Sequence, residues 1–332
     1  MVSARPFAIT FPGQGIKKPG LLSPYRQLKS TLIKDELDVV SDVMGPEFTE
    51  TLLESEKVAE EGWIKKTSNA QPAVLATSYI INQIMKKQFN VDLVSHPGAK
   101  YILGHSLGEY SAHLVNGSFS FPLALRLVSE RATIMEQLVQ QRGSKFSMKA
   151  VLFDATRFDE LVEEFAEQGI LANVNASNQL VISGEESEII EIINANKSKI
   201  KRALPLYVNV PFHSKILDGV EPKLREFLTE RMDTESFTGQ LPVVSNLTGL
   251  PSKGEESLSN TLAANSKPVQ WVKSMQFLAS DGVADVINVG PGSVVSGLNS
   301  RYNVKNHNLE TLQQMETLAN YLEKKCGSEE NS

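Results

Sequence analysis

A serine framed by glycines stands between a predicted strand and a predicted helix, and this run constrains the fold more than any other. Tyr101–Leu103 is a short apolar stretch, Gly104–Gly108 has the sequence Gly-His-Ser-Leu-Gly, and Leu107–Val115 has a helical pattern. A Gly-x-Ser-x-Gly run in this context makes a sharp turn that holds the serine hydroxyl above a sheet. The following helix directs its first N–H groups at Ser106, which favours a developing oxyanion. We therefore expect an activated serine; the alternative is a plain strand-to-helix turn.

Short apolar strands alternate with helices over most of the chain, which predicts a parallel sheet covered on both faces. The expected strands are Phe7–Phe11, Tyr101–Leu103, Val243–Val244 and Val286–Val289, and the expected helices are Gln71–Ile84, Leu107–Val115 and Pro122–Val139. Pro72 suits a first helical turn. Residues 16–66 have a mixed, mostly helical pattern that does not place individual elements, and it suggests no role for them.

A second pattern covers residues 144–208, where the order is strand, helix, strand, strand, helix, strand. The expected elements are Lys149–Phe153, Phe158–Gln168, Leu171–Val174, Leu180–Ile182, Ser187–Ile193 and Leu204–Val210. This order is the ferredoxin-like arrangement. We predict a ferredoxin-like small domain, residues 144–208, inserted into a large α/β-hydrolase-like domain made of residues 1–143 and 209–332.

Charge and cysteine content exclude several classes of function. The formal net charge is −6, which argues against nucleic acid as the main partner, although a local basic patch stays open. No apolar run approaches the roughly 20 residues that a membrane-spanning helix needs. Cys326 is the only cysteine, which suits a reducing compartment and excludes cysteine-rich metal sites.

A serine hydroxyl needs a base, and the position of His213 favours it over the other four histidines. His213 follows the last strand of the predicted small domain, where the chain returns to the large domain, and clefts between domains are common sites. His105 adjoins Ser106, so its side chain is expected to point elsewhere. His113, on the next helix, is more typical of a surface or packing residue.

Arg131 lies in the middle of an apolar stripe on its predicted helix, between Leu127, Val128, Ile134, Met135 and Leu138. Because arginine cannot lose its charge, such a position needs an anion. Two anions remain open: an internal carboxylate such as Glu109, or a carboxylate on the substrate. Gln14, after the first strand, would reach the same sheet edge as Ser106 unless Gly13–Gly15 is a bare turn.

These runs together resemble the malonyl-CoA:acyl carrier protein transacylases. The matching runs are Phe11–Gly15, Gln71–Ala73, Gly104–Ser111, the stretch around Arg131, Lys201–Leu206, Val210–Ser214, Pro268–Trp271 and Val289–Gly292. They span nearly the whole chain in the family's order. Residues 16–66 match poorly, and Lys17–Pro24 is similar to a longer loop of fungal mitochondrial members.

The resemblance implies roles for named residues. Ser106 would be the nucleophile, His213 its base, and the N–H groups of Gln14 and Leu107 the oxyanion hole. Arg131 would bind the malonyl carboxylate through a bidentate pair, and the backbone carbonyl of Gln270 would orient the histidine in place of an aspartate. Phe212 matches a phenylalanine of malonyl-selective enzymes, and Lys201 and Arg202 are candidates for the contact with acyl carrier protein.

The implied reaction is a ping-pong malonyl transfer from malonyl-CoA to the phosphopantetheine thiol of acyl carrier protein, supplying fatty acid synthesis without a metal or redox cofactor. We expect a monomer without membrane insertion, in the mitochondrial matrix or, for a bacterial chain, in the cytoplasm. Two other functions stay open: a serine hydrolase or thioesterase of the α/β-hydrolase type, and a binding module that only docks carrier protein.

Overall fold

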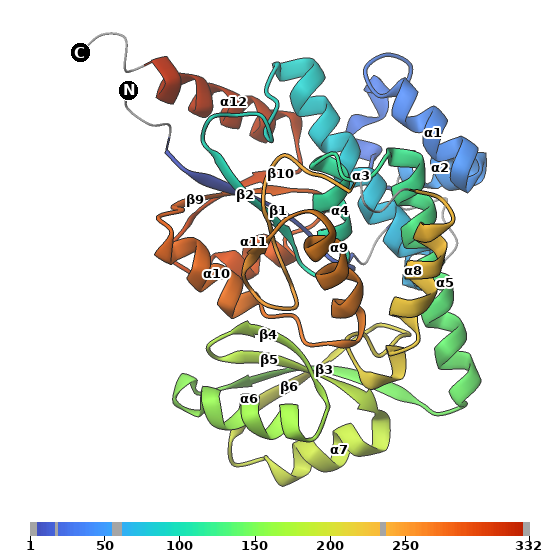
Figure 1. Ribbon diagram of the computed structural model, residues 1–332, viewed down its shortest axis with the longest axis vertical. Helices are drawn as coiled ribbons and strands as arrows, with labels where there is room; N and C mark the ends of the chain where they lie inside the picture. The colour runs from blue at the N-terminus through green and yellow to red at the C-terminus, as the bar shows by residue number, and fades with distance from the viewer. Residues whose placement is uncertain (1–4, 17–18, 55–61, 233–236, 328–332) are drawn as a thin grey trace.

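The chain forms two sheets that lie one above the other in Figure 1. The computed structural model describes residues 5–16, 19–54, 62–232 and 237–327, with side chains up to Glu323. The strands of the six-stranded sheet, in spatial order, are β10 (Lys305–Leu309), β9 (Asp285–Val289), β1 (Phe7–Phe11), β2 (Ala99–Gly104), β7 (Val243–Val244) and β8 (Pro251–Ser252). All neighbouring pairs are parallel except β7 and β8. The predicted parallel sheet is therefore confirmed.

Both faces of the large sheet are covered, and β1 shows how the sequence achieves this. Every residue of β1 is buried. Phe7, Ile9 and Phe11 pack into one hydrophobic cluster, whereas Ala8 packs into another on the opposite face. Because side chains alternate across a strand, a strand buried on both faces needs a continuous apolar run.

The helices divide between these two faces (Figure 1). The cluster of Phe7 holds residues from α1 (Lys34–Met44), α2 (Pro46–Leu53), α3 (Thr67–Phe89), α4 (Leu107–Val115), α5 (Phe121–Arg142), α8 (Val220–Thr229), α9 (Gly254–Ala263) and α12 (Leu312–Gly327). The cluster of Ala8 holds residues from α10 (Trp271–Ser280) and α11 (Val294–Asn299). Residues 16–66, which the sequence did not place, supply α1 and α2 as well as short 3₁₀ turns at Ser23–Leu28 and Trp63–Lys65.

The second sheet takes all its strands from within the predicted 144–208 segment. Its elements are β3 (Phe146–Phe153), α6 (Phe158–Glu167), β4 (Leu171–Ala176), β5 (Gln179–Glu185), α7 (Glu186–Ala195) and β6 (Ile200–Leu206). The spatial order is β4-β5-β3-β6, and every pair is antiparallel. The predicted order of strands and helices is confirmed. Leu161, Phe165 and Ile189 bring α6 and α7 onto this sheet.

Two sequence predictions about elements were wrong, and the strand β10 was missed. Pro72 lies inside α3, not in its first turn, because Glu136 on α5 accepts hydrogen bonds from the amides of Thr67 and Ser68 and so starts the helix earlier. The last small-domain strand is Ile200–Leu206 rather than Leu204–Val210, because residues 200–206 pair with β3. The polar strand β10 was missed, since its pairing with β9 is not visible in its composition.

The small sheet docks on the large domain through its edge strand β4. Val174 donates to the carbonyl of Val269, and Val269 donates to the carbonyl of Ala172, at 2.8 and 2.9 Å. His105 Nε2 hydrogen-bonds Asn175 Oδ1 at 2.9 Å. The side chain of His105 therefore contacts the small domain, in agreement with the expectation that it points away from Ser106, and the segment around Val269 is fixed to β4.

Among the described residues, no helix is both long and apolar enough to cross a membrane. The same residues include no group of three or more His, Cys, Asp or Glu side chains suited to a metal ion. Cys326 lies outside the described side chains.

Candidate active site

Ser106 occupies a strained turn between β2 and α4. Its backbone has φ 54° and ψ −111°, a conformation that costs an L-residue about 1–3 kcal/mol. The flanking glycines permit it. A Cβ on Gly104 would lie 1.9 Å from the Gly108 carbonyl carbon, and a Cβ on Gly108 would lie 2.2 Å from the Phe11 carbonyl oxygen. The glycines are therefore required by close packing between α4 and the strands.

Asn246, which follows β7, holds this turn at two points. Its Oδ1 accepts the Ser106 amide at 2.8 Å, and its Nδ2 donates to the Gly104 carbonyl at 2.6 Å. One side chain thus links the residue before the turn to the residue at its centre. The strained backbone of Ser106 is supported by a neighbouring strand as well as by its own helix.

His213 is in position to act on the Ser106 hydroxyl. Its Nε2 lies 2.8 Å from Ser106 Oγ, while its Nδ1 lies 3.0 Å from the carbonyl oxygens of Ala264 and of Lys267. Because carbonyls only accept, we assign the proton to Nδ1, which leaves Nε2 free to accept from serine. Burial and the nearby Arg131 cation lower the pKa of His213 to about 3. The imidazole is therefore neutral at physiological pH.

The prediction that the Gln270 carbonyl orients His213 was wrong. That carbonyl accepts from the Ser274 amide at 3.0 Å in the first turn of α10, and the Gln270 amide donates to the Asn246 carbonyl. The orienting carbonyls are those of Ala264 and Lys267. Gln270 starts a helix, so its carbonyl is used within that helix.

Arg131 is buried beside the serine, as the apolar stripe predicted it would be. It is 2% exposed, its Nε donates to Asn265 Oδ1 at 2.6 Å, and its guanidinium carbon lies 5.1 Å from the centre of the Tyr110 ring. Among the described residues, no carboxylate lies within 4.0 Å of it. The guanidinium is held by neutral groups, and its charge is available to a ligand.

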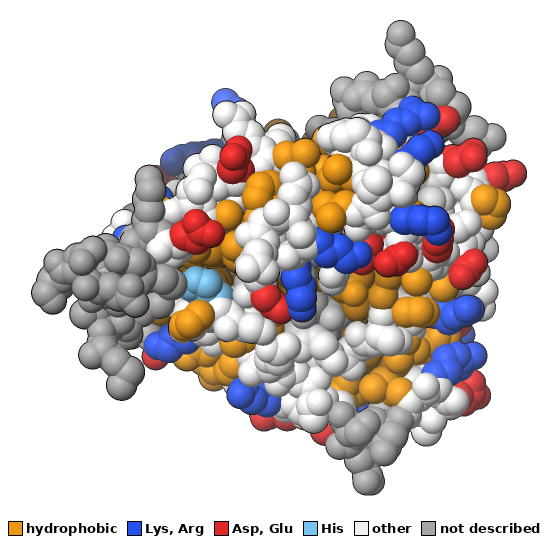
Figure 2. All heavy atoms as spheres, turned by 90° about the horizontal axis from the view of Figure 1, so that it is seen from above, with side chains coloured by type: hydrophobic (Ala, Val, Ile, Leu, Met, Phe, Trp, Pro, Cys, Tyr) orange, Lys and Arg blue, Asp and Glu red, His pale blue; other side chains and the backbone are white. Residues whose placement is uncertain are grey.

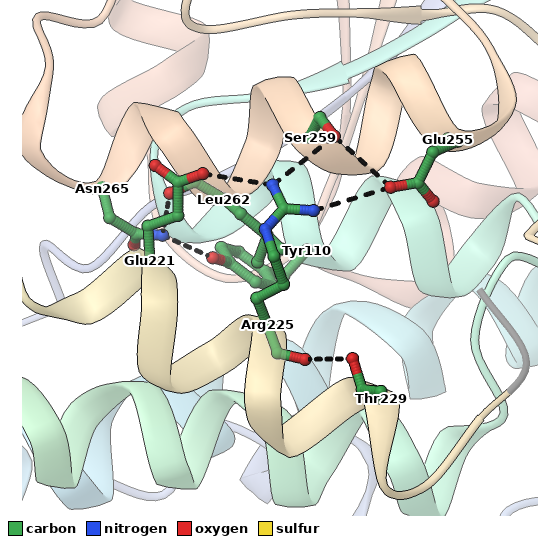
Figure 3. A network of polar contacts seen from close by, with 8 residues as sticks. All are labelled: Tyr110, Glu221, Arg225, Thr229, Glu255, Ser259, Leu262 and Asn265. Carbon is green, nitrogen blue, oxygen red and sulfur yellow. Dashed lines mark hydrogen bonds and ion pairs between the residues drawn. The ribbon is translucent and has the colours of Figure 1, made fainter.

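Polar contacts of Arg225 join α8 to α9, and separate contacts hold Asn265 just after α9 (Figure 3). Arg225 on α8 pairs with Glu221 on its own helix at 3.1 Å and with Glu255 on α9 at 3.6 Å. Asn265 Nδ2 in turn donates to the Tyr110 hydroxyl at 2.9 Å. Asn265 therefore links Arg131, Tyr110 and the end of α9.

Glu109 is the second buried charge of the site, one turn after Ser106. Its Oε1 accepts from the Thr261 hydroxyl at 2.7 Å, and its Oε2 accepts from the Asn246 amide at 2.9 Å. Burial raises the pKa of Glu109 to about 7, although these hydrogen bonds and Arg131 act in the other direction. The internal pairing of Glu109 with Arg131, one of the two alternatives left open by the sequence, is thus an electrostatic interaction across a pocket, without a contact ion pair.

A small pocket joins these groups. Its lining residues are Ser106, Glu109, Tyr110, Arg131, His213, Asn246, Thr261, Ala264 and Asn265. The nucleophile candidate, the base candidate and the buried arginine therefore face one space.

The predicted oxyanion donors lie at the start of α4 and after β1. In the first turn of α4, the amides of Gly108 and Glu109 donate to the carbonyls of His105 and Ser106. Within the described residues, neither Leu107 nor Gln14 donates its amide to another backbone group. The Gln14 side chain contacts Thr67 Oγ1 at 3.5 Å.

The remaining predicted residues lie outside the pocket. Phe212 is buried in the main hydrophobic core and does not line the pocket. Lys201 and Arg202 are exposed at the beginning of β6. Lys201 forms an ion pair with Asp154 at 3.2 Å, so part of its charge is already compensated.

Sequence reasoning missed Asn246, Thr261 and Asn265. Asn246 follows a strand of the parallel sheet, so the convergence of strand ends on one edge could have suggested it. Thr261 and Asn265 lie near the end of α9, where nothing in the sequence marks them, because only the packing of α9 on α4 brings them to the site.

Comparisons with known proteins show the family of the chain. Residues 11–312 match the family described as "Acyl transferase domain". The chain is 31% identical over 318 residues to a malonyl CoA-acyl carrier protein transacylase of Staphylococcus aureus strain MW2, covering 92% of this chain and 96% of that one. The chain belongs to the malonyl CoA-acyl carrier protein transacylase family.

Other members of the transacylase family support the assignment. The Bacillus subtilis strain 168 transacylase is 32% identical over 304 residues, covering 89% of this chain and 90% of that one. An acyl-carrier-protein S-malonyltransferase structure from Burkholderia pseudomallei 1710b superimposes with a TM-score of 0.81 at 30% identity, covering 95% and 99% of the two chains. A structure described as a type II PKS acyl-carrier protein with its malonyl-transacylase gives 0.81 at 28% identity, with the same coverage. All the pocket residues fall within the matched family region.

Proposed function

We propose that this protein transfers the malonyl group from malonyl-CoA to the phosphopantetheine thiol of acyl carrier protein through a malonyl ester on Ser106. The observation that carries the proposal is Arg131, a buried cation without a contact carboxylate that shares a pocket with Ser106 and His213. A buried guanidinium selects an acyl group that ends in a carboxylate. The names of the related transacylases support the same acyl group and acceptor.

In the proposed mechanism, His213 Nε2 takes the Ser106 hydroxyl proton while Oγ attacks the thioester carbonyl. The amides of Gln14 and Leu107 would stabilise the tetrahedral oxyanion. When the intermediate collapses, the carbon–sulfur bond breaks, and His213 returns the proton to the coenzyme A sulfur. The carrier thiol then repeats these steps on the ester, so that the proton ends on Ser106. Because proton transfer and acyl substitution account for every bond, we propose that no metal or redox cofactor takes part.

The decisive experiment mixes the protein with malonyl-CoA and locates the adduct by mass spectrometry before and after addition of holo acyl carrier protein. We expect one malonyl group on the peptide that contains Ser106, and its movement to the carrier. The Ser106→Ala protein should acquire no label. Rapid loss of label to water without transfer would favour the hydrolase alternative, and an unlabelled wild-type protein would favour a binding module.

We propose that Arg202, more than Lys201, contributes to carrier docking, because Lys201 is already paired with Asp154. Exposed apolar side chains follow at Leu204 and Leu206 on the same strand and at Tyr207 directly after it. A charge at the rim of a protein–protein interface acts mainly on the association rate. An exposed ion pair contributes about 1 kcal/mol or less. Arg202→Glu should therefore raise KM for acyl carrier protein about threefold to fivefold and leave acylation by malonyl-CoA unchanged.

The matched control for that variant is Lys34→Glu on α1, which makes the same change in charge at another exposed basic side chain. Equal effects of both substitutions on KM would point to net charge, not to docking at β6. The face seen in Figure 2 mixes Lys and Arg with Asp and Glu side chains, so it presents no single basic area for docking.

We further propose that the chain forms two domains. Residues 1–143 and 209–332 form a large α/β-hydrolase-like domain, and residues 144–208 form a small ferredoxin-like domain. The antiparallel order β4-β5-β3-β6 with two helices supports the second classification. A monomer in the mitochondrial matrix, or in a bacterial cytoplasm, stays a prediction. Lys17 and Lys18 of the mitochondrial-type loop lie outside the described residues. A role of Phe212 in acyl selectivity also stays a prediction.

A further inference from the structure

The pocket of Ser106 holds two opposite charges that the transfer mechanism uses unequally. Glu109 and Arg131 are the only carboxylate and guanidinium among its lining residues, and they are 1% and 2% exposed. His213 is neutral there, because burial lowers its pKa to about 3. The proposed mechanism gives Arg131 a ligand, the malonyl carboxylate, but it gives Glu109 no step. Burying an ionisable carboxyl costs free energy, so its presence in this pocket indicates a role.

That role follows from the balance of charge between Glu109, Arg131 and the bound acyl group. When the pocket is empty, an ionised Glu109 compensates Arg131 and the site is neutral overall. When a malonyl carboxylate enters, two anions would face one cation in a buried space, and like charges that share a site raise the pKa of one of them. Burial already places the pKa of Glu109 at about 7. Protonation of Glu109 restores neutrality at small cost near physiological pH.

The hydrogen bonds around Glu109 suit both protonation states. The Thr261 hydroxyl lies 2.7 Å from Glu109 Oε1 and 2.9 Å from the Ser257 carbonyl. With its single proton it donates to the carboxylate when Glu109 is ionised. When Glu109 is protonated, the hydroxyl accepts from the carboxyl and donates to the Ser257 carbonyl. The change between the two hydrogen-bond arrangements requires only rotation of the Thr261 hydroxyl.

His113 completes this arrangement from the other side. Its Nε2 lies 2.9 Å from Thr261 Oγ1, and its Nδ1 is buried without a hydrogen-bond partner in the described part of the chain. The proton therefore belongs on Nε2, which donates to Thr261 in both states. Burial lowers the pKa of His113 to about 3, so His113 stays neutral. The other titratable groups around Glu109 are Tyr110 on α4, Arg131 on α5 and His213.

We propose that Glu109 is the countercharge of Arg131 in the empty enzyme and takes up a proton from solvent when a malonyl carboxylate binds. Glu109 is then a specificity-determining residue. It keeps the empty site neutral, and only an acyl group with its own negative charge replaces it as the countercharge of Arg131. This inference rests on the proposed malonyl transfer, because it requires the malonyl carboxylate at Arg131.

The test counts protons by calorimetry. Binding of malonyl-CoA and of acetyl-CoA to the Ser106→Ala protein is measured at about pH 8, where a group with a pKa near 7 is mostly ionised. Each titration is repeated in two buffers with different enthalpies of ionisation. We expect malonyl-CoA to take up close to one proton more than acetyl-CoA. The Ser106→Ala/Glu109→Gln protein should show no such difference, because glutamine keeps the shape of the side chain and cannot titrate.

A kinetic measurement on the wild-type protein provides a second readout. Above pH 7, kcat/KM for malonyl-CoA should fall by up to about tenfold for each pH unit, and Glu109→Gln should remove this slope. Equal proton counts for the two thioesters, or uptake that persists in Glu109→Gln, would overturn the proposal. If Glu109→Gln does not fold, the proton counts with Ser106→Ala still decide. If wild-type Ser106 is malonylated without proton uptake, the proposal for Glu109 fails alone; if Ser106 is never malonylated, the proposed function fails with it.

Discussion

Replacing Arg131 with alanine is expected to lower kcat/KM for malonyl-CoA by about a hundredfold or more, because a buried carboxylate that loses its partner costs about 3–5 kcal/mol. Acetyl-CoA has no second carboxylate, so its kcat/KM should change by less than about tenfold. The measurement is acylation of the protein by each thioester. Arg126→Ala is the matched control, since Arg126 is exposed on the same helix.

Equal losses for malonyl and acetyl groups would refute carboxylate binding by Arg131 and indicate a structural role. Thermal melting separates the two explanations, because Arg131→Ala also leaves Glu109 without a compensating charge. The double variant Arg131→Ala/Glu109→Gln removes both buried charges. It should recover stability without recovering selectivity for malonyl-CoA.

Replacing His213 with alanine is expected to slow acylation of Ser106 by about a hundredfold to ten-thousandfold, the usual contribution of a general base. The fold should persist, since His213 contributes hydrogen bonds at the pocket and little to the hydrophobic core. Single-turnover acylation, followed by mass spectrometry, measures the loss. His307→Ala, a histidine on β10 that contacts Asp285, serves as the control.

The pH dependence of the wild-type protein gives an independent check on His213. A base with its ordinary pKa would lose activity as the pH falls through about 6.5. Burial and Arg131 lower the pKa of His213 to about 3, so acylation should show no loss between pH 7 and about pH 5. An acid limb near pH 6.5, or an ordinary acylation rate in His213→Ala, would assign the base elsewhere.

The sequence predicted those parts of the site that depend on residue type within a regular element. The glycine-framed serine marks the turn because a Cβ on Gly104 or Gly108 would collide with backbone. Arg131 is recognisable because its charge interrupts an apolar stripe at helical spacing. His213 was placed correctly by its position at the return from the small domain, and it lies 2.8 Å from Ser106 Oγ.

Parts that depend on backbone groups or on distant packing could not be predicted in this way. Any residue has a carbonyl, so the sequence could not indicate that Ala264 and Lys267, rather than Gln270, hold His213 Nδ1. The start of α3 was misplaced for a similar reason, because the cap comes from Glu136 on another helix. For Asn246, the convergence of strand ends could suggest a place near the site, but its hydrogen bonds to Ser106 and Gly104 are visible only once β7 lies beside β2.

The pairing of Val269 with β4 has a consequence for attempts to recombine this protein with its relatives. Lys267, whose carbonyl holds His213, lies two residues before Val269, which bonds to Ala172 and Val174 of β4. A chimera that exchanges residues 144–208 alone would therefore change the support of the base along with the small domain. An exchange that also carries residues 264–270 would keep the pairing of Val269 with β4 and the carbonyl that holds His213. The two segments should therefore be exchanged together.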